Sequence, residues 1–508
     1  MAAGSGGGLA DLVQAFLEFE EENGLFAVEV KGRRFWDCIR PYVVEKLLSR
    51  SGAAAAPAGK AGAARGLPYA AYAGRCVEGV WRGIVETVRP RVACDVAVVN
   101  LDRWNLIGGQ RVNMNCFPLV KAMSPSHRIL VVDPVEMRAD AKLLYPESVV
   151  LSSGFHTVDT VKSLGVAYRK QERALFRQIQ GKIRERFGVS VDIAELMRQH
   201  FSLHLVSCER FRRLFERHRP RAVVAAHHAY SAAEAAHEVG IPMIELQHSM
   251  ISPFAMAYNY PASLRMPQVP TIPDVMFTFG EYWNDKFNMP TRKVAVGYPF
   301  FEAKAEEVRR RRPVNCDTAT RSRSLIVISG YLAKAALVRA TLELSRLLPE
   351  STIYYKLKFS DYHGWRDRYP EEFATRENIR VVDNDEVPLY EYFSMCSWAL
   401  GVNSGGLYEA MAYGLTPFIL KAGLYEESRD LYENGYAFLV EVAGEIAAAI
   451  QAGRRPALRL DRESFFKSDA LENMVREIGE ILKGSSAACS TSEEAASRHY
   501  AGSSKRAN

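Results

Sequence analysis

The stretch "WALGVNSGGLYEAMAYGLTPFIL", residues 398–420, decides the fold class of this chain of 508 residues. An apolar run reaches Asn403, and a turn of Ser404, Gly405 and Gly406 follows it. A short helical pattern then ends at Gly414, before a second apolar run. A strand, a helix and a strand joined in this way form a crossover unit, in which both strands are parallel. The stretch therefore predicts an α/β domain.

The same alternation of short apolar runs and helical patterns continues on both sides of this stretch, from about residue 90 to residue 484. It predicts two Rossmann-like doubly wound domains, residues 89–310 and 311–484, that face each other across a cleft. Between them, residues 303–324 are charged and contain "RRRR" at 309–312. We predict a solvated linker without periodic structure there, and a phosphate or lipid-headgroup contact is the alternative. The apolar runs taken as strands are 96–100, 128–133, 148–151, 221–228, 241–248, 274–280, 293–299, 324–330, 352–358, 379–383, 398–403 and 416–420.

The two ends of the chain differ from this alternating region. Residues 1–88 predict a mainly helical extension, interrupted by a low-complexity linker at 51–65, "SGAAAAPAGKAGAAR". The acidic polar face of its first helix argues against binding anionic lipid, so we expect this extension to pack on the first domain. Docking on a membrane or a partner is the alternative. Residues 485–508 are rich in serine and alanine and predict a disordered tail.

Composition limits the classes of function. A net charge of +6 is too small for a nucleic-acid footprint, although it suits anionic small molecules. Eight cysteines without a CxxC pair predict reduced thiols in a cytoplasmic protein. The chain contains no signal-peptide pattern and no run of about 18 apolar residues, so any membrane contact is expected to be peripheral, at the inner face.

Candidate site residues are those that directly follow the predicted strands, because ligands of open α/β sheets bind beyond the carboxyl ends of the strands. The N-terminus of the helix after Ser404 attracts phosphate, and glycine at 405 and 406 lets a phosphate approach the backbone. Glu409 lies on the same helix face as Gly405, where a carboxylate accepts hydrogen bonds from a ribose diol. A tight turn with an exposed Glu409 is the alternative. The other residues at strand ends are Lys356, Lys358, Asn403, His227, His228, Gln247, His248, Gly280, Glu281, Ser329 and Gly330.

His248 is the candidate for proton transfer, because an imidazole with a pKa near 6.5 suits a general base. Adjacent residues on a strand point to opposite sides, so at most one of His227 and His228 is expected to face the site. A metal site made by these three histidines is conceivable, but no carboxylate or cysteine spacing supports it. No DxD pair follows a strand. We therefore expect no metal and a metal-independent reaction.

Four segments carry a resemblance to a known family. "GVNSGGLYEAMAYGLTPFIL" resembles the donor-side signature of GT-B glycosyltransferases, especially enzymes of bacterial capsule and surface-polysaccharide biosynthesis. "IELQHSMISPFAMAYNYP" (244–261) resembles their Gln-His-Gly segment, with Ser249 in place of the glycine. "PDVMFTFGEYWNDKF" with "KVAVGYPFFE" is similar to the segment before their interdomain linker. "YYKLKFSDYHGW" (354–365) has Phe359 and Ser360 where the family has His-Pro, which leaves the nucleotide unassigned.

The resemblance covers roughly residues 220–440 and implies a glycosyltransferase that uses a nucleotide-sugar donor as substrate and no further cofactor. It implies a glycan or lipid-linked acceptor, and a polysaccharide-assembly complex as a possible partner. It also implies His248 as the base. Three alternatives stay open: a sugar-nucleotide epimerase of the same fold, a polyol-phosphate transferase, and a non-catalytic assembly partner. The residues implied to hold the donor are Lys356, Lys358, Asn403, Ser404, Gly405, Gly406 and Glu409.

Overall fold

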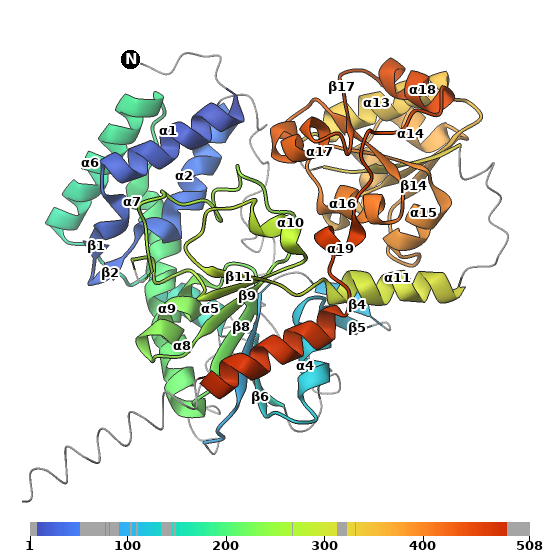
Figure 1. The fold of residues 1–508 in the computed structure, drawn as a ribbon. Coiled ribbons are helices and arrows are strands. Elements are labelled where there is room, and N and C mark those ends of the chain that lie inside the picture. Colours follow the sequence, from blue (N-terminus) through green and yellow to red (C-terminus); the bar gives the residue numbers. More distant parts are fainter. Residues whose placement is uncertain are drawn as a thin grey trace, which may run out of the picture.

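The computed structural model shows two α/β sheets flanked by helices, with a further helical layer at the N-terminal side (Figure 1). It describes residues 8–50, 77, 81, 91–101, 104–107, 110–133, 145, 149–153, 155–266, 268–311, 323–330 and 332–484. The predicted linker at 51–65 and the predicted disordered tail at 485–508 lie outside these residues. Among the helices so described, none has the length and apolar character needed to cross a bilayer.

The first sheet has seven strands, all parallel, in the order β11-β10-β9-β8-β3-β6-β7. Numbered along the chain within this sheet, the order from β7 is 3-2-1-4-5-6-7, which extends the Rossmann order 3-2-1-4-5-6 by one strand. The first Rossmann-like domain predicted from the sequence is therefore confirmed. The strands are β3 (Val96–Asn100), β6 (Ile129–Asp133), β7 (Val150–Ser153), β8 (Ala222–Ala226), β9 (Met243–Leu246), β10 (Val275–Thr278) and β11 (Arg292–Ala295).

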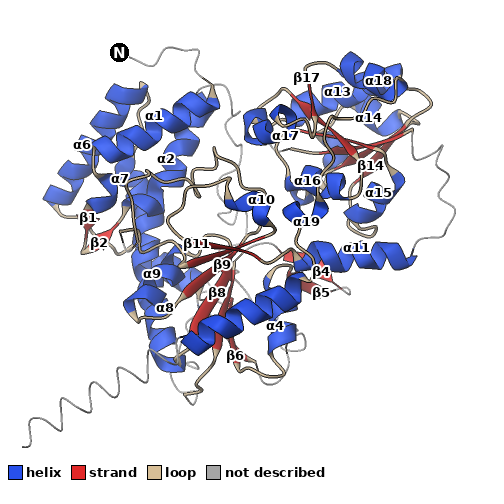
Figure 2. Cartoon of the chain, in the orientation of Figure 1, coloured by secondary structure: helices blue, strands red, loops and turns tan. Residues whose placement is uncertain are grey.

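The second sheet has six parallel strands in the order β14-β13-β12-β15-β16-β17. Numbered in the same way, this order is 3-2-1-4-5-6, so the second half is also a Rossmann-like domain. Both domains are seen in Figure 2, where the strands of each sheet (red) lie between helices (blue). The strands are β12 (Ser324–Ile328), β13 (Thr352–Lys356), β14 (Ile379–Val382), β15 (Trp398–Gly401), β16 (Thr416–Leu420) and β17 (Phe438–Val440).

Continuous apolar runs explain why both sheets are covered on both faces, since successive side chains of a strand point to opposite sides. In β12, Leu325 and Val327 pack under α13 (Lys334–Leu347) and α18 (Ala443–Gln451). Ile326 and Ile328 pack on the other face, towards α15 (Leu389–Met395) and α16 (Gly405–Ala412). On the first sheet, α8 (Ser202–His218) and α9 (Tyr230–Glu238) cover one face, and α4 (Cys116–Met123) contributes to the cover of the other.

The N-terminal layer packs on the first domain, as predicted. Helices α1 (Leu9–Glu22) and α2 (Trp36–Arg50) share an apolar core with α6 (Lys170–Phe187) and α7 (Ile193–Leu196). Between them, η1 (Leu25–Ala27) leads into a small antiparallel hairpin of β1 (Glu29–Val30) and β2 (Arg33–Arg34). Aromatic rings fill this core, with Phe16 and Phe35 each in contact with Trp36.

A buried arginine joins this layer to the loop that follows β9. Arg40 is 1% exposed and forms an ion pair with the buried carboxylate of Glu20. Its guanidinium also donates to the backbone carbonyls of Met256 and Asn259. On the same helix, Asp37 accepts hydrogen bonds from Tyr260 (3.0 Å) and Thr271 (2.5 Å). The loop after β9 is therefore held by charged groups of the N-terminal layer.

The segment predicted as a non-periodic linker is partly helical. Helix α11 spans Pro299–Arg311, so the prediction is wrong for residues 303–311, and residues 312–322 lie outside the described chain. The segment has a helical periodicity that is not evident among its many charged residues. Phe301, Ala305 and Val308 are buried at helical spacing. On the exposed side, Arg309 pairs with Glu306 at 3.1 Å.

The end of the chain returns to the first domain, whereas the sequence predicted that residues 311–484 form one donor domain. A helix at residues 470–484 lies along the first sheet (red in Figure 1). Its Met474, Ile478 and Leu482 complete the core on that face. The segment before the helix crosses close to Gly280, where an added Cβ would lie 2.1 Å from the carbonyl oxygen of Ser464.

Replacing Arg40 by Met tests the contribution of the buried ion pair. The variant leaves the carboxylate of Glu20 buried without its cation, which typically costs about 3–5 kcal/mol. We expect the free energy of unfolding, measured by urea titration, to fall by that amount. Arg186→Met is the matched control, because Arg186 pairs with Glu18 on the surface at 3.2 Å and should cost less than about 1 kcal/mol. Equal losses in the two variants would contradict a structural role for the buried pair.

Candidate active site

The candidate site lies where the strand order of each sheet reverses. In a sheet of order 3-2-1-4-5-6, the loops after strands 1 and 4 leave in opposite directions and open a crevice at the carboxyl edge. In the first sheet this point lies between β3 and β8, and β8 is followed directly by His227 and His228. In the second sheet it lies between β12 and β15, which lead into Ser329–Gly330 and Asn403–Gly406.

The two reversal points meet in the folded chain. A Cβ added to Gly405, in the first turn of α16, would lie 3.5 Å from the backbone nitrogen of Met250, two residues after His248. The rings of Trp283, in the first domain, and Tyr408, in α16, also meet across the domain boundary, with their centroids 4.8 Å apart. Segments about 150 residues apart in the sequence are thus in direct contact between the two domains.

Further polar contacts join the domains beside this meeting point. Lys286, in the first domain, lies 3.3 Å from Asp430 in α17 (Arg429–Glu433) of the second. Burial raises the pKa of Asp430 to about 7. From the N-terminal layer, the first amide of α1, at Leu9, donates to Glu426. The two domains are closed on each other in this structure.

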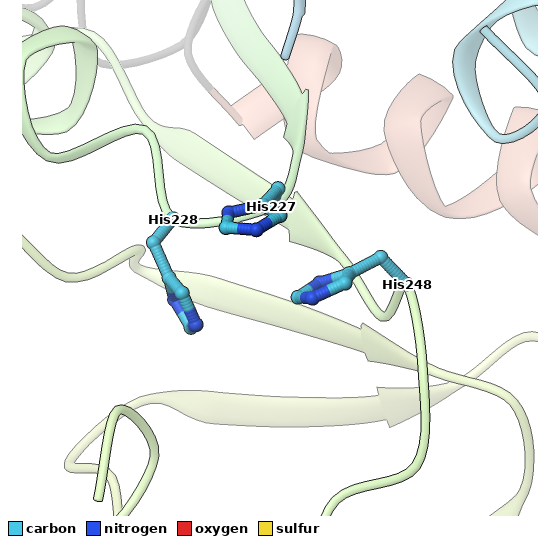
Figure 3. A group of neighbouring side chains, drawn as sticks. All are labelled: His227, His228 and His248. Atoms are coloured by element: carbon cyan, nitrogen blue, oxygen red, sulfur yellow. The ribbon is translucent and has the colours of Figure 1, made fainter. Parts of the chain in front are cut away.

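Three histidines form a cluster on the first-domain side (Figure 3). One ring nitrogen each of His227, His228 and His248 lies within 4.8 Å of the other two. The rings of His227 and His248 are stacked, with their centroids 4.4 Å apart. His228 stands nearly perpendicular to both.

The prediction that at most one of His227 and His228 faces the site is wrong. The alternation rule assumed that both lie in the strand, but β8 ends at Ala226. His227 has a φ of 78°, in the left-handed region that residues with a side chain rarely adopt. This turn places the rings of His227 and His228 beside His248 together. Backbone strain of this kind persists where surrounding structure enforces it, and it is common at functional sites.

A carboxylate that the sequence analysis missed lies beside the cluster. Glu245, in β9, is 3% exposed, and burial raises its pKa to about 8. It accepts a hydrogen bond from the Tyr258 hydroxyl at 3.5 Å, and the same hydroxyl lies 3.2 Å from Nδ1 of His248. Nδ1 of His228 lies 3.4 Å from Glu245. The signal in the sequence was a charged residue inside an otherwise apolar strand, "MIEL", because such residues are rarely buried without a partner.

On the second-domain side, Ser404 caps α16. Its hydroxyl accepts a hydrogen bond from the amide of Gly406 at 3.3 Å. An added Cβ at Gly406 would lie 3.2 Å from Ile328 at the end of β12, so glycine fits this close approach. Ser329 and Gly330, which follow β12, are buried beside the same turn.

Two of the predicted donor residues are engaged by protein groups. The Tyr390 hydroxyl donates to the carboxylate of Glu409 at 2.6 Å, and burial raises the pKa of that carboxyl. The side-chain amide of Asn403 donates to Glu427 at 2.8 Å. Asn403 directly precedes Ser404, and Glu409 lies one turn into α16, so both side chains are oriented by these bonds.

The lysines lie one strand away from the turn. Lys356, at the end of β13, donates to Asp385 (2.8 Å) and to the carbonyl of Asn384 (2.7 Å), so its charge is used in a local network. Lys358, two residues further, is exposed.

Three other predicted cleft residues have structural partners. Gln247 is 2% exposed and joins strand ends, donating to the carbonyl of Ser249 and accepting from the amide of Phe279. Gly280 is covered by the crossing segment, so it does not open toward the site. Glu281 is exposed and accepts a hydrogen bond from Asn284 in α10 (Glu281–Asn284).

No protein-family profile and no curated protein matches the chain. Among solved structures, it is similar to the UDP-GlcNAc 2-epimerase of Methanocaldococcus jannaschii, with 12% identity, 76% of this chain and 99% of that chain covered, and a TM-score of 0.45. The Neisseria meningitidis UDP-GlcNAc 2-epimerase bound to UDP-GlcNAc gives 11% identity, coverage of 76% and 99%, and a TM-score of 0.46.

A glycosyltransferase is found at a similar level. The spinosyn rhamnosyltransferase SpnG, complexed with thymidine diphosphate, has 14% identity, coverage of 78% of this chain and 100% of that chain, and a TM-score of 0.40. All three scores are below 0.5. The fold assignment therefore depends on the strand order of the two sheets, and the site is interpreted from its own residues.

Replacing Tyr390 by Phe tests whether the carboxyl of Glu409 needs its partner. The variant leaves a buried acceptor without its hydrogen bond, which costs about 1–3 kcal/mol. We expect that loss in the free energy of unfolding. Tyr392→Phe is the control, since Tyr392 lies on the same helix and packs its ring on Tyr354 at 5.2 Å. Its effect should stay within about 0.5 kcal/mol. A loss in Tyr392→Phe as large as in Tyr390→Phe would contradict the assignment.

Proposed function

We propose that the chain is a glycosyltransferase that moves a sugar from a nucleotide-sugar donor to a hydroxyl of a growing surface glycan, free or lipid-linked. The observation that carries the proposal is the direct contact between the two reversal points, with the α16 turn on one side and the His248 loop on the other. A phosphate site and a proton-accepting site then face each other across the domain boundary, which is what sugar transfer between two substrates requires.

The second domain binds the donor in this proposal. Backbone amides at the start of α16, with Gly405 and Gly406, hold the phosphates, and the helix dipole favours their negative charge. Glu409, oriented by Tyr390, accepts hydrogen bonds from the ribose. Lys358, which is exposed two residues after the end of β13, supplies a cation for the phosphates.

The transfer step exchanges one bond for another. The acceptor oxygen forms a bond to the anomeric carbon as the bond from that carbon to the phosphate oxygen breaks, and the electron pair leaves with the nucleotide. Backbone amides of α16 stabilise the charge that develops on this phosphate. The proton of the acceptor hydroxyl passes to the histidine cluster. His248 of this cluster lies on the loop that contacts α16.

Donor binding requires the domains to separate first. With Met250 3.5 Å from the Cβ position of Gly405, the closed structure leaves the phosphates no room above the turn. Opening breaks the contacts of Lys286 with Asp430 and of Leu9 with Glu426. Closure over a bound donor would bring the domains together again with the phosphates between Met250 and the turn, and would exclude water, which limits hydrolysis of the donor.

Nucleotide binding is the first test. We expect one nucleoside diphosphate from a panel of UDP, GDP, ADP, dTDP and CDP, with CMP beside them, to raise the melting temperature. A ligand at 100 times its Kd stabilises by about 2.7 kcal/mol. Gly405→Leu places a side chain on the phosphate position and should abolish the shift. Gly181→Leu is the control, because Gly181 lies in α6 with no atom within 4 Å of an added Cβ. Unchanged nucleotide binding in Gly405→Leu would overturn the phosphate site.

Replacing His248 by Ala tests the acceptor side. We expect the nucleotide-induced melting shift to remain, while transfer to acceptor falls by about 10²- to 10⁴-fold, the usual contribution of general acid–base catalysis. The exposed His363 serves as the control for loss of an imidazole elsewhere. Full transfer by His248→Ala would remove this residue from the mechanism. Conversion of the donor by the unmodified protein without acceptor would instead indicate an epimerase.

A further inference from the structure

We propose that His227, His228 and His248 bind a Zn²⁺ ion, with Glu245 as the carboxylate that orients two of the three rings. Imidazole nitrogen is a preferred zinc ligand, and three protein ligands leave a fourth position open for water or substrate, as in catalytic zinc sites. Binding of the ion does not depend on the glycosyltransferase proposal. Its role in transfer, given below, rests on that proposal.

The ring nitrogens are already near the separation that a metal requires. One nitrogen of each histidine lies within 4.8 Å of the others. Nitrogen atoms at about 2.0–2.1 Å from a tetrahedral zinc are about 3.4 Å apart. The rings therefore need to approach by about 1.5 Å or less, which rotation of the side chains supplies.

Glu245 and Tyr258 lie on the Nδ1 side of two of the rings. If the Tyr258 hydroxyl gives its one proton to Glu245, its oxygen accepts from Nδ1–H of His248. His228 likewise has Nδ1 on the side of Glu245, at 3.4 Å. In both rings Nε2 is then the nitrogen that carries a lone pair. A carboxylate on the far nitrogen of a ligating histidine is the outer shell typical of zinc sites.

The backbone of His227 supplies an independent observation. Its φ of 78° lies in the left-handed region, which is unfavourable for a residue with a side chain. This backbone conformation places the ring of His227 against His248, whereas a continuation of β8 would point the ring elsewhere. A third ligand explains why an unfavourable conformation is held at this position.

Two acidic side chains lie behind the cluster. Glu245 and Asp37 are both buried, and Glu245 lies 3.4 Å from Nδ1 of His228. The nearby cation, Arg40, is already bound to Glu20. A second group, His204, Cys208 and Glu234, has a comparable ligand set. There, however, Arg33 pairs with Glu234 at 2.8 Å, so a cation is already present.

The ion would act on the acceptor. A hydroxyl bound at the open position has a lowered pKa, so its O–H bond breaks more readily near neutral pH and the proton passes to water. His248 is then a metal ligand, and the ion takes the place of a free imidazole in activating the acceptor. The sequence set aside a histidine metal site because no carboxylate or cysteine spacing supports it, and the structure places the carboxyl group of Glu245 beside the cluster.

The test is direct measurement of metal binding to the full chain, first stripped with a chelator. We expect one Zn²⁺ per chain by elemental analysis after dialysis, and a visible absorption spectrum of tetrahedral intensity with Co²⁺. His228→Ala should weaken Zn²⁺ binding more than about 100-fold, and Glu245→Gln about 10- to 100-fold. His363→Ala should leave it unchanged. Absence of bound Zn²⁺ in the unmodified protein, or equal affinity in His228→Ala, would overturn the site.

Two readouts keep the result interpretable. The melting temperature of the unmodified chain should rise with Zn²⁺ concentration, which needs no variant and excludes misfolding as the cause. The nucleotide-induced shift, which depends on the α16 turn, should persist in His228→Ala. A chain that binds nucleotide but no zinc would overturn the zinc site and leave the proposed function intact. A chain that binds zinc but no nucleotide would overturn the proposed function and leave the zinc site intact.

Discussion

The close packing of the crossing segment on two glycines holds the molecule in its present arrangement. An added Cβ at Gly297 would lie 2.3 Å from the carbonyl of Lys467, and one at Gly280 would lie 2.1 Å from that of Ser464. The backbone of the C-terminal segment thus touches the ends of β10 and β11 with no side chain between them. Because this contact and helix α11 both connect the two sheets, the two reversal points face each other, and the candidate site exists only in that arrangement.

A chain of buried polar groups extends from the N-terminal layer to the site. Arg40 joins Glu20 to the carbonyls of Met256 and Asn259, and so holds the loop that carries Tyr258. Tyr258 in turn contacts His248. The layer that the sequence presented as an accessory extension is therefore continuous with the first-domain half of the site, and a change in α1 or α2 reaches His248 through this loop.

The sequence predicted the two sheets well and the candidate site only in part. The physical reason is different for the sheets and for the site. Parallel strands covered on both faces must be continuously apolar, so runs such as "VAVVN" and "SLIVI" identified them directly. The Ser404 turn followed from the same rule, because its glycines stand where a strand ends. His227 was misjudged because a positive φ in a non-glycine residue has no sequence signature. Helix α11 was missed because its charges outnumber its apolar residues. Glu245 was missed because a single carboxylate in a strand is informative only once its neighbours are known.

The C-terminal helix has a consequence for the synthesis of the protein. Residues 470–484 cover an apolar face of the first sheet, and that sheet is otherwise complete at Ala295. A ribosome adding about 5–20 residues per second needs roughly 10 to 40 s to supply the missing helix. During that time the first domain exposes Ile244, Val296 and their neighbours to water. The first domain is thus not a unit that can complete its core before the second domain is made.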